Sequence, residues 1–152
     1  MSKWLFRVAA TFLLAATCVA PSRLHAQPAD AASAIEPNVV YGMVGGLALL
    51  MDVHRPEKPN GFGVVAIIGT AWRAGPGYDE PQMKEEPYQL GVFVKPLVSA
   101  GYTVFAINHR GAPQFRYPAP IEDSERAVRF IRYNAKRFGI AADRIGAVGA
   151  SS

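Results

Sequence analysis

Cysteine is almost absent from this chain of 152 residues, in which Cys18 is the only one. A single thiol cannot form an intramolecular disulfide, so export of the protein would not imply a disulfide-stabilised fold. Histidine is scarce too, with three residues in the whole chain. We expect neither a bound metal nor a cofactor.

Acidic residues are missing from the first 26 positions, which hold three of the sixteen lysines and arginines. The formal charge of the whole chain is +4, but the residues from Gln27 onward carry thirteen basic and twelve acidic side chains, a net charge of +1. Because these basic and acidic residues are interleaved, no strongly positive surface is expected. We predict that the protein binds no nucleic acid.

The apolar run at residues 8–20 is too short to cross a bilayer, which takes about 20 residues. It follows two basic residues, Lys3 and Arg7, and leads into a short exit that ends at Ala26. This is the pattern of a secretory signal peptide. We predict that residues 1–26 are removed, leaving a secreted or periplasmic protein with no stable membrane insertion.

Three alternatives to cleavage after Ala26 are weaker. Cleavage after Ala20 would place Pro21 directly behind the scissile bond, where its ring and missing N–H block processing. A retained membrane anchor would need a longer apolar run. Acylation of Cys18 would make a lipoprotein, but residues 15–17 lack the usual leucine and small residue in front of it.

Beyond the signal, residues 27–38 show little periodicity and are predicted to be a flexible lead-in to one domain at residues 39–152. Gly45-Gly46 between two apolar runs predicts an antiparallel hairpin. Three short apolar runs predict buried strands, and apolar residues at helical spacing predict two helices between them. The hairpin is expected at residues 39–44 and 47–53, the strands at 64–68, 102–107 and 144–148, and the helices at 88–99 and 120–138.

This order of elements predicts an α/β fold with a doubly wound, mostly parallel sheet that carries an antiparallel hairpin at its N-terminal end. Binding sites in such sheets lie at the carboxyl ends of the strands. Three loops are therefore expected to meet at one edge of the sheet. They are residues 69–72, 108–112 and 149–152.

Ser151 is the candidate nucleophile in the last of these loops. A serine hydroxyl is weakly nucleophilic, so an acyl-transfer enzyme exposes it on a sharp turn between a strand and a helix, with glycine two residues before and two after. Gly149 supplies the first glycine, and the second would be residue 153. The alternative is an ordinary strand end, where small residues are common.

Such a reaction also needs two backbone N–H groups directed at the oxyanion, one from the residue after the nucleophile and one from the loop after the first central strand. Here these would be the N–H of Ser152 and those of Thr70 and Ala71. Trp72 follows and could form a wall of the substrate pocket. Its alternative role is to pack over the core.

Seven ordered blocks of this sequence resemble the α/β-hydrolase esterases of the hormone-sensitive-lipase and bacterial feruloyl or acetylxylan esterase type. They are MDVHRP at residues 51–56, INHRGAP at 107–113, YPAPIED at 117–123, RAVRFIR at 126–132, FG at 138–139, DRIG at 143–146 and GASS at 149–152. The resemblance implies hydrolysis of carboxylic esters by a secreted enzyme with Ser151 as nucleophile. One departure is the segment IGTAW, where these families usually carry HGGGW, so Thr70 and Ala71 restrict backbone angles that glycine leaves open.

The histidine and acid of a triad follow the serine along the chain in this fold. His54 and His109 both precede Ser151, so we expect neither to be the catalytic base. We interpret His54 as a strand-end residue and His109 as a packing or rim residue of the substrate pocket, while Asp123 is interpreted as a charge in the first turn of a helix. The base and acid are expected after residue 152, so this chain alone should be inactive.

The leading functional hypothesis is a serine carboxylesterase that acts on small-molecule or polysaccharide-linked esters. A serine peptidase or a dienelactone-type hydrolase would use the same fold and the same Ser151 with a different pocket. A non-catalytic relative used for binding is the third alternative, in which the small residues of the loops serve packing only.

Overall fold

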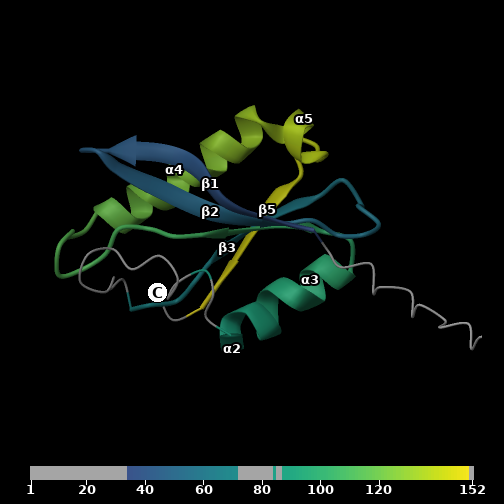
Figure 1. Cartoon of the computed structure of the whole chain (residues 1–152), viewed down its shortest axis with the longest axis horizontal. Coiled ribbons are helices and arrows are strands. Elements are labelled where there is room, and N and C mark those ends of the chain that lie inside the picture. Colours follow the sequence, from purple (N-terminus) through teal and green to yellow (C-terminus); the bar gives the residue numbers. More distant parts are fainter. Residues whose placement is uncertain (1–33, 72–83, 85–86, 151–152) are drawn as a thin grey trace, which may run out of the picture.

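The computed structural model describes residues 34–71, 84 and 87–150. These residues form a five-stranded mixed sheet with helices on both faces. In Figure 1, α4 and α5 lie on one side of the sheet, and α2 and α3 lie on the other. This arrangement confirms the predicted doubly wound α/β fold.

The antiparallel hairpin consists of β1 (Ile35–Val44) and β2 (Leu47–His54). Gly45 and Gly46 form its turn with φ angles of 54° and 86°, a backbone region that glycine adopts without steric cost. β1 begins inside the segment expected to be a flexible lead-in. A bulge between Glu36 and Val39, where Asn38 has a φ of 58°, breaks the alternation by which a strand is recognised in a sequence.

The parallel part of the sheet consists of β3 (Gly63–Ile67), β4 (Thr103–Ile107) and β5 (Ile145–Gly149), as predicted to within one residue at each end. The strand order is β1-β2-β4-β3-β5. In this register, Ile67 lies level with Ile107 on one side and with Gly149 on the other. The three parallel strands therefore end together at one edge of the sheet.

The helix predicted at residues 88–99 is present, but it changes geometry along its length. It consists of α2 (Pro87–Gln89), the π-helical η1 (Leu90–Val94) and α3 (Lys95–Ser99). The N–H of Lys95 donates to the carbonyl of Leu90 five residues earlier. Pro96 follows directly, and because its ring carries no N–H and crowds the preceding turn, an α-helical ladder is disfavoured there.

The helix predicted at residues 120–138 is divided in two, α4 (Ala119–Tyr133) and α5 (Ala135–Phe138). The break is at Asn134, whose side-chain Nδ2 donates to the carbonyl of Phe130 at 2.8 Å. A short polar side chain that bonds to nearby backbone competes with the helical ladder. Gly139 ends α5 with a φ of 70°, as the sequence predicts.

Two apolar clusters hold the layers together, one on each face of the sheet. The larger cluster joins the sheet to α4 and α5 and contains Phe105 and Phe138, whose rings meet edge to face with centroids 4.9 Å apart. The smaller cluster packs Val94 and Val98 of the opposite helix on Val104. Among the described residues, no helix is long and apolar enough to span a bilayer.

Gly101, in the turn before β4, should tolerate no side chain. Its φ is +92°, and a Cβ atom there would lie 2.8 Å from the backbone oxygen of Lys58. We expect Gly101→Ala to lower the free energy of unfolding by about 1 to 3 kcal/mol. A matched control is Gly146→Ala, because none of the described residues lies within 4 Å of a Cβ at that position. Urea unfolding of both variants would contradict the prediction if they were equally stable.

Candidate active site

The carboxyl edge of the parallel strands gathers the loops that follow β3, β4 and β5. Figure 1 places the end of β5 and the loop between β4 and α4 on the same side of the molecule. Thr70, Ala71 and His109 lie among the described residues. The other predicted site residues, Ser151, Ser152 and Trp72, lie outside them.

The loop after β3 has an unusual backbone. Ala71 has a φ of 51°, in the left-handed region that residues other than glycine rarely adopt. The hydroxyl oxygen of Thr70 is buried and has no hydrogen-bond partner among the described residues. Backbone in such a region costs on the order of 1 kcal/mol or more and persists only where surrounding contacts enforce it.

Gln89 supplies such a contact from the end of α2. Its side-chain Oε1 accepts a hydrogen bond of 2.7 Å from the N–H of Gly69, and its Nε2 donates one of 2.9 Å to the carbonyl of Gly69. The two bonds fix the backbone immediately before Thr70. Nothing in the sequence singled out Gln89, because it lies 20 residues further along the chain.

His109 follows β4 and is fully buried. Its Nδ1 lies 3.0 Å from the backbone oxygen of Arg110. Burial lowers the pKa of this imidazole, and hydrogen bonding to the backbone of Arg110 and Ile68 only partly opposes the effect. The imidazole therefore connects the loops that follow β3 and β4, and its side chain is not exposed at a rim.

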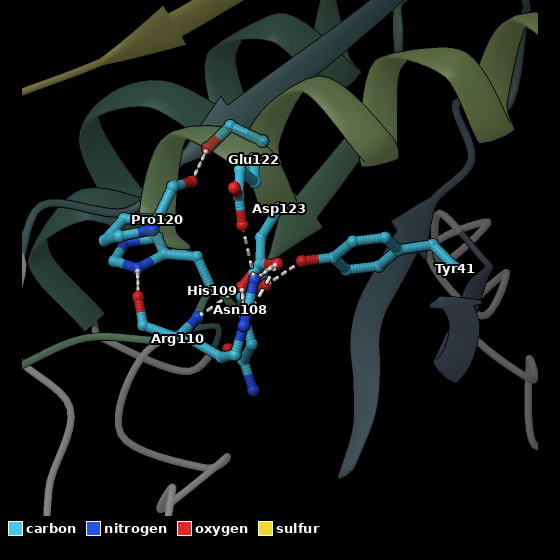
Figure 2. A network of polar contacts seen from close by, with 8 residues as sticks. Tyr41, Asn108, His109, Arg110, Pro120, Glu122 and Asp123 are labelled. Atoms are coloured by element: carbon cyan, nitrogen blue, oxygen red, sulfur yellow. Dashed lines mark hydrogen bonds and ion pairs between the residues drawn. The ribbon is translucent and has the colours of Figure 1, made fainter. Parts of the chain in front are cut away.

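Arg110 and Asp123 form a buried ion pair beneath the loop after β4 (Figure 2). The Nη2 and Nε atoms of Arg110 lie 2.8 Å and 2.9 Å from the two carboxylate oxygens, and the backbone N–H of Arg110 donates to the same group at 2.8 Å. These hydrogen bonds to Asp123 raise the pKa of Arg110 above its ordinary value. Asp123 thus ties α4 to this loop, which corrects its interpretation as a first-turn charge.

The sequence held a signal for this role of Asp123. Its side chain lies four residues before Ala127 and eight before Ile131, both fully buried, so it falls on the apolar face of α4. A carboxylate on that face must have a partner, since an unpaired buried charge is strongly unfavourable.

The hairpin supports the loop after β4 from the side. Tyr41 of β1 points toward Asn108, and its hydroxyl donates to the carbonyl of that residue (Figure 2). The N–H of Asn108 in turn donates to the carbonyl of Leu50 at 2.9 Å. Contacts with two strands therefore hold the first residue after β4.

A second buried ion pair lies on the opposite face of the sheet, between Lys84 and Asp52 of β2. The Lys84 Nζ lies 2.8 Å from Asp52 Oδ1 and also bonds to the side chain of Asn38. His54, two residues along β2, is buried nearby, and this burial lowers the pKa of its imidazole. The pair anchors Lys84, which precedes α2 in the chain, to the hairpin.

A small apolar pocket opens in the loop between β4 and α4. Its lining residues are Ala112, Phe115, Tyr117, Pro120 and Ile121. The guanidinium of Arg110 lies 5.5 Å from the centre of the Phe115 ring, so the buried ion pair also supports this pocket. Within the described part of the chain, no group of three or more His, Cys, Asp or Glu side chains could hold a metal ion.

The layers, strand order and edge loops define an α/β-hydrolase fold. The family model BD-FAE matches residues 51–152, about two thirds of the chain. The chain belongs to the BD-FAE family. A comparison with curated proteins gives no match.

Solved structures share this fold. The bifunctional GH43-CE protein of Bacteroides eggerthii is 29% identical, with a TM-score of 0.62 over 78% of this chain and 16% of its own. A truncated carbohydrate esterase from gut microbiota is 27% identical, with a TM-score of 0.63 over 80% and 40% of the two chains. An arylesterase, 22% identical with a TM-score of 0.62 over 80% and 37%, shares the fold. The chain therefore spans less than half the length of each.

Breaking the buried Arg110–Asp123 pair should destabilise the fold. Asp123→Ala would leave a guanidinium that is 7% exposed without its main partner, so we expect a loss of about 3 to 5 kcal/mol in the free energy of unfolding. The control is Glu125→Ala, which removes an exposed partner of Arg129 at 3.3 Å and should cost less than about 0.5 kcal/mol. Equal unfolding midpoints in denaturant for the two variants would contradict this prediction.

Proposed function

We propose that this chain belongs to a secreted serine hydrolase of carboxylic esters that works through an acyl-enzyme. One observation carries the proposal: β5, which leads to Ser151, is the parallel neighbour of β3, which leads to Thr70 and Ala71. A nucleophile and oxyanion donors on adjacent strand ends are the arrangement that acyl transfer in this fold requires.

In the proposed reaction, the Ser151 hydroxyl adds to the ester carbonyl while a histidine located after residue 152 accepts its proton. The oxyanion of the tetrahedral intermediate accepts hydrogen bonds from the backbone N–H groups of Ser152 and of Thr70 or Ala71. Collapse breaks the bond to the alcohol, which leaves with that proton. Water then cleaves the acyl-enzyme by the same steps and releases the acid.

The substrate would be a small-molecule ester or an ester carried on a polysaccharide. Two relatives with 27% and 29% identity support this proposal, one of them described as a carbohydrate esterase and the other as a bifunctional GH43-CE protein. We propose that Trp72 forms a wall of the pocket. Because His109 is fully buried, we propose that it packs between the loops beside the pocket.

The alternatives from the sequence differ in substrate or in chemistry. A serine peptidase or a dienelactone-type hydrolase would share Ser151, and a binding protein would retain the fold without turnover. The relative with 27% identity, which is described as a carbohydrate esterase, favours an esterase. Offering p-nitrophenyl acetate, aryl esters of ferulate and small peptides to the complete gene product separates these alternatives.

Ser151→Ala should abolish turnover of p-nitrophenyl acetate by the complete gene product. Loss of the nucleophile is expected to reduce kcat by at least about a thousandfold, because no covalent intermediate can form. The control is Ser99→Ala, at an exposed position that ends α3. Retention of wild-type kcat in the Ser151 variant would remove the proposed mechanism.

Export should remove the first 26 residues. We expect the mature protein isolated from the culture medium or the periplasm to begin at Gln27, as determined by mass spectrometry of the intact chain. A mass that retains Met1, or a diacylglycerol on Cys18, would overturn the signal-peptide assignment.

A further inference from the structure

We propose that Gln89 is a positioning residue for the oxyanion donors, a role that rests on the proposed function. It makes no contact with the reacting atoms in this role. It acts by holding the Gly69 backbone, from which the chain continues into Thr70 and Ala71.

The two hydrogen bonds of Gln89 restrain Gly69 more fully than one bond would. The carboxamide accepts from the N–H and donates to the carbonyl of the same residue, at 2.7 Å and 2.9 Å. Rotation of the backbone on either side of Gly69 would break at least one of them. The N–H of Gly69 is engaged by Gln89, so the oxyanion donors are assigned to Thr70 and Ala71.

Packing of its own helix fixes the position of Gln89. Leu90 follows it directly and packs on the cluster that contains Val94 and Val98, against β3 and β4. The main chain of Gln89 is helical, with φ −69° and ψ −37°, and its side chain makes no capping bond within its own helix. The amide is therefore presented to the loop from the start of a helical segment that packs on β3 and β4 through Leu90, Val94 and Val98.

Ala71 makes this restraint necessary. Its φ of 51° would cost glycine nothing, but it is unfavourable for alanine, so the loop would relax if its supporting contacts were removed. A relaxed loop would turn its N–H groups away from the oxyanion. The effect on the reaction would appear in the transition state, where the negative charge develops, and much less in the binding of the ester.

The test compares Gln89→Leu, Gln89→Glu and a matched control, Gln114→Leu, in the complete gene product with p-nitrophenyl acetate. Gln114 is exposed in the loop after β4, and the structure assigns it no role in the site. For Gln89→Leu we expect kcat to fall by about ten- to a hundredfold with KM within about twofold of wild type. Gln89→Glu keeps the acceptor for the Gly69 N–H and loses the donor to the Gly69 carbonyl. Its kcat should therefore lie between that of Gln89→Leu and that of wild type.

Amide hydrogen exchange supplies a readout that does not depend on activity. In Gln89→Leu, the peptide that contains Gly69 to Ala71 should exchange faster, while β3 and β4 keep their protection. A kcat equal to that of wild type would overturn the positioning role. So would exchange that becomes faster throughout the sheet and not mainly in the peptide that contains Gly69 to Ala71.

The two proposals can fail separately. If Ser151→Ala is inactive and Gln89→Leu has the kcat of wild type, only the positioning role of Gln89 is lost. If Ser151→Ala keeps full activity, the proposed mechanism is wrong, and the assignment of Gln89 to an oxyanion site fails with it.

Discussion

Parallel pairing of β3 with β4 on one side and β5 on the other determines where every part of the candidate site lies. The register ends the three strands together, so loops separated by about 40 residues in the sequence meet at one edge of the sheet. The pairing of β3 with β4 is buried on both faces, since Val65 and Phe105 face α4 and α5 while Val64 and Val104 face the helix opposite.

Buried polar contacts then set the loops on this frame. The Arg110–Asp123 pair joins the loop after β4 to α4, and the Lys84–Asp52 pair joins the segment before α2 to the hairpin. Such pairs add little net stability compared with apolar packing, but each has one good geometry because any other leaves a charge unpaired. In this protein they lie on opposite faces of the sheet and restrain the segments that border its carboxyl edge.

The loop after β3 differs from the glycine-rich form that the resemblance implies. Thr70 and Ala71 replace glycines, and Ala71 nevertheless adopts a left-handed backbone. The left-handed backbone is less favourable for alanine than for glycine, and the two hydrogen bonds of Gln89 hold the residue that precedes Thr70. Backbone strain that neighbouring contacts enforce is common at functional sites.

The sequence by itself determined the layers, the hairpin turn at Gly45-Gly46, the three parallel strands and the loops at their ends. These follow from periodicity and from glycine, which are local properties of the chain. It did not determine the start of β1 at Ile35, the break at Asn134, or the partners of Asp123, Lys84 and Gln89. Only the tertiary structure decided those, because each depends on an atom many residues away or on a side chain that competes with the local pattern.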